Sequence, residues 1–108
     1  ALSPAEIDLL QRRYRLQLHY FVHACFIPEG GVLAAAGRIA ALSVPVHVLQ
    51  GLADEVCPPS ATAVLLEQLP NAGCNWVEGV GHDPYAPAMQ ATTLGLVESF
   101  ATLGRFVP

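Results

Sequence analysis

Two short predicted strands separated by one helical segment constrain the fold of this chain more than any other feature. Residues 44–50 form a β-branched run that ends at Gly51, and residues 74–78, Cys-Asn-Trp-Val-Glu, are expected to form a second strand. A continuous apolar run of this length is typical of a strand buried on both faces of a parallel sheet. Helices are expected from about 60 to 69 and from about 87 to 103, so the pattern predicts β-α-β-α with a right-handed crossover.

The N-terminal part of the sequence predicts helices only. Ser3 can cap a helix, a proline occupies the first helical position, and Glu6 completes a capping box. This pattern predicts a helix that continues to about residue 21. Proline and glycine interrupt it at 28–31, and a second short helix is expected from about 32 to 42.

The composition indicates that this polypeptide leaves apolar surface for something else to cover. Hydrophobic residues make up 53% and charged residues 13% of the sequence, whereas about 25% is usual for charged residues in a soluble domain. A small domain has much surface for its volume and needs more charge, not less. No run reaches the roughly 18 apolar residues of a membrane span, so no membrane partner is expected.

The fold class follows from the number of strands and from this apolar surface. Two parallel strands rarely form a sheet by themselves, because parallel sheets are covered on both faces and hold more strands. The sequence therefore predicts an α/β architecture in which the β-α-β-α segment is the C-terminal edge of a larger, doubly wound sheet. Its exposed strand edge would favour self-association by strand pairing.

Charge and cysteine content exclude some classes of function. A net charge of −4 argues against nucleic-acid binding, and the basic cluster at 12–15 is explained as a solvated helix face. Cys25, Cys57 and Cys74 have neither disulfide nor zinc-site spacing, so buried, reduced thiols in a cytoplasmic protein are expected. His19 and His23 are four residues apart without a third ligand nearby, so no metal or other cofactor is expected.

An acidic residue follows the first predicted strand, and a histidine follows the second. Functional groups of open α/β sheets cluster beyond the carboxyl ends of the strands. Asp54 and His82 can therefore meet, with the carboxylate fixing the imidazole tautomer and the other ring nitrogen acting as a general base. Glu55 and Asp83 are neighbouring alternatives for the acid, although Asp83 is expected to point elsewhere or to cap the last helix.

Three motifs resemble those of proline iminopeptidases. The segment 51–58, G-L-A-D-E-V-C-P, resembles the family's G-R-x-D-x-x-C-P. Gly81-His82 resembles the start of its G-H-S, and the segment 19–21 resembles the H-Y-F of its E-x-H-Y-F. The resemblance implies the C-terminal part of an α/β-hydrolase that releases N-terminal residues, typically proline, from peptides. It implies a remnant of the helical cap at 1–42 and a βαβα part of the hydrolase core at 43–108.

The resemblance also implies residue roles, and the sequence departs from the family at three positions. Asp54 and His82 would be the triad acid and base. Leu52 replaces the family's arginine, Asp83 replaces its serine, and Gln17 replaces a glutamate that helps to bind the substrate's free amine. Gln17 keeps an acceptor oxygen but loses the charge, which weakens such a hydrogen bond about twofold. The substrate contacts that the resemblance implies are Gln17, Tyr20, Phe21 and Glu29.

The nucleophile of such an enzyme is missing from this sequence. None of the four serines lies in a Gly-x-Ser-x-Gly elbow. The hydroxyl is therefore expected from an N-terminal segment that this chain lacks, and the chain alone is expected to be inactive as a peptidase. Two alternatives stay open: a non-catalytic truncated remnant or interaction module, and an α/β-hydrolase that acts on another ester or amide.

Overall fold

The computed structural model describes residues 2–107 and divides into two compact units, Ala1–Val32 and Leu33–Pro108. The first unit contains helix α1 (Pro4–Val22) and the short 3₁₀ helix η1 (Ala24–Phe26). Helix α2 (Gly31–Ala41) begins at the end of this unit and lies mostly in the second. The second unit continues with the elements that the sequence predicted as β-α-β-α.

Helix α1 begins at the capping box that the sequence predicted. The Ser3 hydroxyl accepts a hydrogen bond from the Glu6 amide at 3.3 Å, and the Glu6 carboxylate accepts one from the Ser3 amide at 2.8 Å. These hydrogen bonds lower the pKa of Glu6, with the Ser3 backbone N–H as the larger cause. No residue of α1 is buried within the described chain, so the helix is specified by its cap and local interactions.

The η1 turn was not predicted from the sequence. Ala24, Cys25 and Phe26 all have positive φ angles, between 49° and 57°. Residues other than glycine rarely adopt this left-handed conformation, because the Cβ atom approaches the backbone. The Phe26 ring stacks on His23, with 5.2 Å between ring centroids, and contacts Tyr20 edge-on at 5.4 Å. The last side chain of η1 therefore packs against aromatic side chains at the end of α1.

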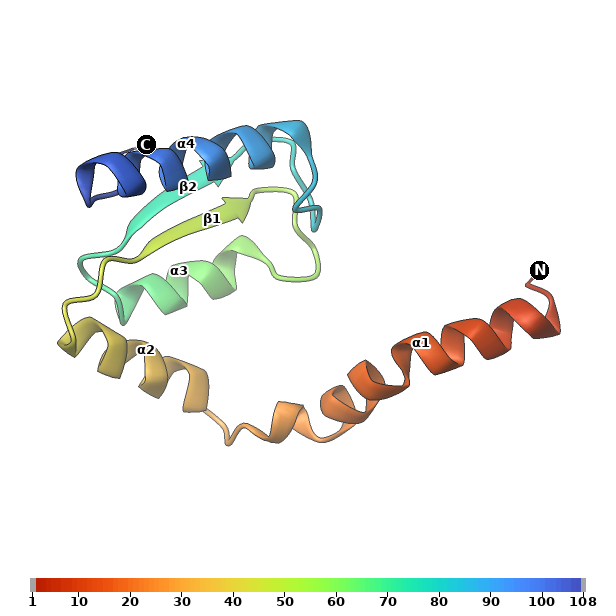
Figure 1. The fold of residues 1–108 in the computed structure, drawn as a ribbon. Coiled ribbons are helices and arrows are strands. Elements are labelled where there is room, and N and C mark those ends of the chain that lie inside the picture. Colours follow the sequence, from red (N-terminus) through yellow and green to blue (C-terminus); the bar gives the residue numbers. More distant parts are fainter. Residues whose placement is uncertain (1, 108) are drawn as a thin grey trace. The chain divides into compact units, whose positions relative to one another are not determined.

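The second unit is built around one parallel pair of strands. Strand β1 (His47–Gly51) pairs with β2 (Gly73–Val77), and helix α3 (Pro59–Glu67) connects them. Helix α4 (Pro87–Leu103) follows β2. Figure 1 shows the two strands between α3 and α4. The order of the predicted elements is confirmed, and α3 begins at Pro59, after its N-cap Pro58, close to the expected start at about 60.

The prediction of a doubly wound α/β-hydrolase sheet fragment is wrong. Within residues 2–107, four α-helices accompany a sheet of two strands only, which makes this a small mixed fold. The sequence patterns at 44–50 and 74–78 did predict parallel pairing. They carry no information on how many strands join the sheet, because a strand in a two-stranded or a six-stranded sheet has the same local sequence pattern.

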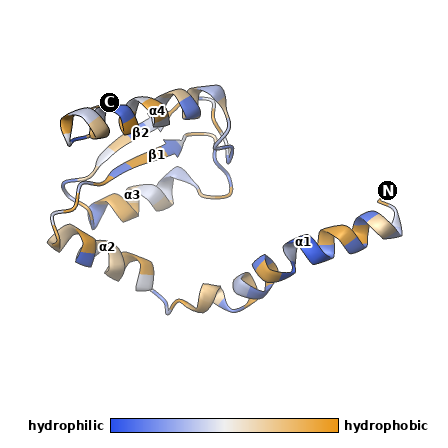
Figure 2. Cartoon of the chain, viewed as in Figure 1, coloured by the Kyte–Doolittle hydropathy of each residue, from blue (hydrophilic) through white to orange (hydrophobic). Residues whose placement is uncertain are grey.

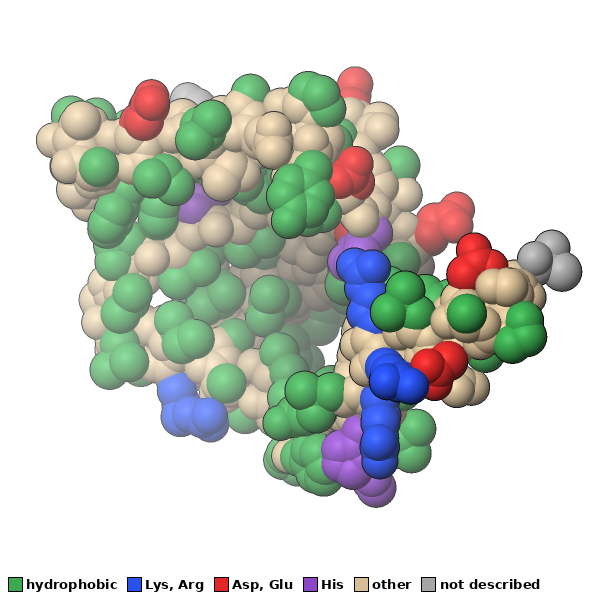
Figure 3. All heavy atoms as spheres, turned by 45° about the vertical axis from the view of Figure 1, so that its right-hand side comes forward, with side chains coloured by type: hydrophobic (Ala, Val, Ile, Leu, Met, Phe, Trp, Pro, Cys, Tyr) green, Lys and Arg blue, Asp and Glu red, His purple; other side chains and the backbone are tan. Residues whose placement is uncertain are grey.

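The core of the second unit is small, and much apolar surface is left exposed. The buried hydrophobic residues of the described chain are Ala36, Leu69, Val80 and Leu96. Figure 2 shows hydrophobic residues on the strands and on every helix of this unit. Many of their side chains reach the surface in Figure 3. The expectation from composition, that apolar surface would be left uncovered, therefore agrees with the exposed side chains.

Candidate functional site

The two strands end level with each other, which brings the loops after them together. Gly51 and Val77 are partners in the last register position of the parallel pair. Backbone hydrogen bonds continue past the strands: the Leu52 amide donates to the Val77 carbonyl at 3.0 Å, and the Ala53 amide donates to Val80 at 2.9 Å. The loop that contains Asp54 is therefore tied directly to the loop that contains His82.

Gly51 permits this close approach of the two loops. A Cβ atom at this position would lie 2.3 Å from the Val80 carbonyl oxygen and 2.9 Å from that of Gly81. Both distances are shorter than any contact that a real side chain makes, and the obstacles are backbone atoms that cannot rotate away. The glycine at the end of the first strand is thus required by the packing of one loop on the other.

Gln50 holds the Asp54 loop through buried hydrogen bonds, a role that was not predicted from the sequence. Its side chain is buried, and its Nε2 group donates to the carbonyls of Gly51 at 2.8 Å and Cys57 at 3.0 Å. The Thr62 hydroxyl donates to its Oε1 atom. The signal available in the sequence was a glutamine at the end of the run 44–50. A buried amide must satisfy each of its polar atoms, so such a residue is expected to bind nearby polar groups.

Asp54 and His82 are in direct contact. The distance from His82 Nδ1 to Asp54 Oδ2 is 3.0 Å, within hydrogen-bond range. The second carboxylate oxygen, Oδ1, accepts hydrogen bonds from the backbone amides of Val56 at 2.9 Å and Cys57 at 2.8 Å. The carboxylate is therefore fixed on both sides, and the contact predicted from the sequence is present.

This hydrogen bonding keeps the carboxylate ionised. The pKa of Asp54 is lowered from its ordinary value, with the Cys57 backbone hydrogen bond as the largest cause. Burial acts in the opposite direction, and the hydrogen bonds from His82 and Val56 add to the lowering. An ionised carboxylate can orient the imidazole and stabilise the positive charge that the imidazole gains when it accepts a proton.

The imidazole is accessible while its acidic partner is not. The His82 side chain is 55% exposed and that of Asp54 is 10% exposed. Because Nδ1 faces the carboxylate, Nε2 is the ring nitrogen that can exchange a proton with a bound molecule. The pair lines a pocket of about 330 Å³, together with Cys57, Pro84 and Met89 among others. This volume lies in the range of small-molecule sites.

The neighbouring acids do not take the place of Asp54. Asp83 accepts a hydrogen bond from the Tyr85 amide at 2.8 Å and so stabilises the turn before α4. It does not cap that helix, whose N-cap is Ala86. Glu55 makes no hydrogen bond or ion pair that the structure records within residues 2–107. No group of three or more potential metal ligands exists among the described residues.

The pocket holds a thiol but no serine. Among the described residues that line it, Cys57 is the only one of a nucleophile type used in acyl transfer. Cys57 and Cys25 are exposed, so the expectation of buried thiols is wrong for both. The polar loop around Asp54 places Cys57 at the surface. Cys74 is partly buried, and this burial raises the pKa of its thiol.

The substrate contacts that the resemblance implied belong to the first unit. Gln17, Tyr20 and Phe21 lie on α1, and Glu29 lies in the turn before α2; all four are exposed. Tyr20 packs edge-on against Phe26. Their roles in substrate binding stay predictions.

Comparison of the chain with protein families, curated proteins and solved structures finds no match. The similarity to proline iminopeptidases therefore depends on the short motifs alone.

One apolar segment meets the length and composition of a membrane span. It comprises the 18 residues Ala24–Ala41. A spanning helix must satisfy its backbone hydrogen bonds internally over its whole length. Here residues 27–30 separate η1 from α2 and are not helical, which argues against a span. The absence of a membrane partner and the cytoplasmic location stay predictions.

Proposed function

We propose that Asp54 and His82 form the acid–base pair of a serine hydrolase of the proline iminopeptidase type. In this proposal the enzyme releases N-terminal residues from peptides, and a serine outside the described residues supplies the nucleophilic hydroxyl. The observation that supports it is the 3.0 Å contact between Asp54 Oδ2 and His82 Nδ1, at the adjacent ends of two parallel strands.

The geometry suits a proton transfer in two directions. His82 Nε2 accepts the proton of the serine hydroxyl as its oxygen attacks the scissile carbonyl carbon. Nε2 then gives this proton to the leaving amine, and the acyl group stays on the serine. Water, deprotonated by the same nitrogen, releases the acyl group and regenerates the hydroxyl. Asp54 stays ionised throughout and orients the ring, in keeping with its lowered pKa.

Substrate selection in this proposal follows the residue roles that the resemblance implies. Tyr20 and Phe21 would contact a small ring, while Gln17 and Glu29 would accept hydrogen bonds from the free amine. A neutral Gln17 amide binds an ammonium group less strongly than a carboxylate does. Comparing free with N-blocked peptide substrates tests this part, since a hydrolase of other esters or amides would not distinguish them.

The function of the pair can be tested on the chain itself. Without the serine, we expect no turnover of a proline arylamide. We do expect slow hydrolysis of an activated ester such as p-nitrophenyl acetate. Its leaving group needs no protonation, so His82 can promote this reaction without a serine. His82→Ala should remove most of this ester hydrolysis, and Asp54→Asn should reduce it. His23→Ala is the matched control, since His23 is also exposed but forms no ion pair with a carboxylate within residues 2–107.

Three results would count against the proposal. If the chain itself turned over the arylamide and His82→Ala abolished this activity, no outside serine would be needed. If Cys57→Ala also abolished the arylamide turnover, the Cys57 thiol would be the nucleophile. Ester hydrolysis that survives His82→Ala would show that the histidine is inert. In a longer polypeptide with a Gly-x-Ser-x-Gly elbow, Asp54→Asn should lower kcat about 10⁴-fold, and a loss below about tenfold would exclude the acid role.

A further inference from the structure

A second pocket lies at the opposite end of the sheet from Asp54 and His82. Its volume is about 340 Å³, and its lining includes His47 and Gly73, which are the first register partners of the two strands. The two strands have five residues each, so the two ends of the sheet are about 13 Å apart at roughly 3.3 Å per residue. This pocket belongs entirely to the second unit and does not depend on the proposed hydrolase function.

One wall of this pocket is aromatic and held in place by several contacts. His47 Nε2 donates to Asn75 Oδ1 at 2.6 Å. The ring lies over Gly73 so closely that a Cβ atom there would be 2.4 Å from His47 Nδ1. Phe106 contacts the His47 ring at 5.5 Å between centroids and stacks on Phe100 at 4.8 Å. The wall is therefore a fixed aromatic surface in which the planes of the His47 and Phe106 rings are inclined at 58° to each other.

The charge of the pocket is positive. Arg105 is part of the lining, and no aspartate or glutamate from the described chain is. Arg38 and Arg105 are the only arginines or lysines in residues 33–108. The ion pairs of the described residues involve Arg12 and His82, so none that is recorded engages Arg105. A guanidinium group beside an apolar wall favours a planar, charged partner that it can bind through two parallel hydrogen bonds.

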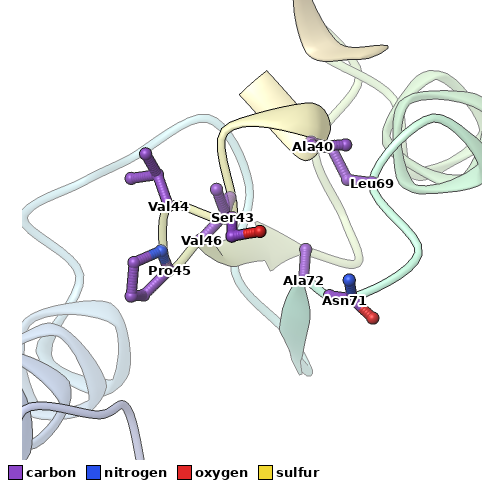
Figure 4. Close-up of a pocket in the computed structure, with 8 residues that line it drawn as sticks. All are labelled: Ala40, Ser43, Val44, Pro45, Val46, Leu69, Asn71 and Ala72. Atoms are coloured by element: carbon purple, nitrogen blue, oxygen red, sulfur yellow. The ribbon is translucent and has the colours of Figure 1, made fainter. Parts of the chain in front are cut away.

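A smaller cavity of about 130 Å³ adjoins this pocket. The two share Pro45, Val46 and Asn71 as lining residues. Figure 4 shows the smaller cavity, in which Ser43 and Asn71 are the polar side chains among the eight that line it. Neither cavity has an acidic lining residue. The lining of the two cavities therefore combines apolar side chains with a few hydrogen-bonding groups and one cation, as in many sites for small organic anions.

We propose that the pocket around His47, Arg105 and Phe106 binds a small monocarboxylate with a flat apolar body. Arg105 pairs with the carboxylate, and the His47–Phe106 wall and Pro45 contact the apolar body. Charge and shape together define this class: a neutral amide of the same shape lacks the charge, and a simple inorganic anion lacks the apolar body.

Benzoate is a suitable probe, with benzamide as the uncharged probe of the same shape. Both are titrated into the uniformly ¹⁵N-labelled chain, and amide chemical shifts are followed by NMR. We expect benzoate to shift amides at 46–47, 71–74 and 105–106, and to bind at least about tenfold more tightly than benzamide, which reflects one charged hydrogen-bonding partner. Arg105→Gln should remove this difference. Arg38→Gln, which makes the same charge change in the same unit, should preserve it.

Several outcomes would overturn the proposal. Equal affinity for benzoate and benzamide would exclude recognition of charge. Equal loss in Arg105→Gln and Arg38→Gln would indicate a general electrostatic effect, and shifts confined to 52–58 and 79–86 would place the anion at the other end of the sheet. Arg105→Lys keeps the charge but not the planar fork, so it should bind benzoate with an intermediate affinity. Wild-type affinity in Arg105→Lys would contradict the bidentate contact.

Discussion

Asp54 links the stability of the second unit to pH. Its folded pKa lies below its ordinary value of 3.8, mainly because the Cys57 amide donates to it. At pH values between the folded and unfolded pKa, the unfolded chain binds more protons, so stability rises with pH. The stabilisation is therefore complete above the ordinary carboxyl range and is lost as the pH falls through the lowered folded pKa.

We expect Asp54→Asn to destabilise the chain at neutral pH and to have a smaller effect in acid. Urea unfolding of both proteins from pH 2 to pH 7 measures this, and the two stability curves should converge as the pH falls. Glu55→Gln removes one carboxylate from the same loop and serves as the charge-matched variant. Parallel curves for wild type and Asp54→Asn over the whole range would show that the native contacts of Asp54 do not favour its ionised form.

The roles of some site residues could be predicted from the sequence, and those of others could not. Asp54 and His82 were predicted because both follow strands, and parallel strands bring their carboxyl ends to one edge. Gln50 was missed because two of its three partners, Cys57 and Thr62, are brought near it only by the fold. Arg105 was missed for a similar reason: it follows the last helix, and nothing local indicates that its segment returns to the start of β1.

The junction between the two loops is the part of the fold that positions the candidate site. Gly51→Ala would place a Cβ atom 2.3 Å from the Val80 carbonyl oxygen, so the loop before His82 must move. We expect a loss of about 1–3 kcal/mol in the free energy of unfolding, as for other overpacked sites, and loss of the His82-dependent ester hydrolysis. Both are measured on the same preparation, by urea unfolding and by a spectrophotometric assay.

Gly81→Ala provides the matched substitution on the opposing loop. Its nearest neighbour would be the Ala53 carbonyl oxygen at 3.5 Å, an ordinary contact. This variant should change the unfolding free energy by no more than about 0.5 kcal/mol. If Gly51→Ala were as stable as Gly81→Ala and kept its ester hydrolysis, the close approach of the two loops would not be what positions the pair.

The order of helices and strands was predictable because it depends on local patterns. The capping box at Ser3, the β-branched run before Gly51 and the proline at the start of α4 each indicate their element from neighbouring residues. The extent of the sheet was not predictable, because strand number depends on contacts between distant segments. The η1 turn was missed because three consecutive positive φ angles without glycine contradict local preference.

The helices of this molecule present more apolar surface than its small core can bury. On α4, Leu96 is buried, whereas Leu94 is 62% exposed and Val97 is 58% exposed. An amphipathic helix buries only the stripe that meets a neighbour. Exposed apolar side chains grouped on one helix favour association with other surfaces.

We therefore expect the chain to self-associate through the outer face of α4 at high concentration. The double substitution Leu94→Lys and Val97→Lys removes this apolar face and adds charge repulsion between copies, so its sedimentation coefficient should stay constant where that of wild type rises with concentration. Gln68→Lys adds charge at an exposed, already polar position at the C-cap of α3, away from α4, and should behave like wild type. The double variant could instead still associate. If that association were then lost on a charged or proline substitution at the free edge of β1 or β2, the contact would be strand pairing.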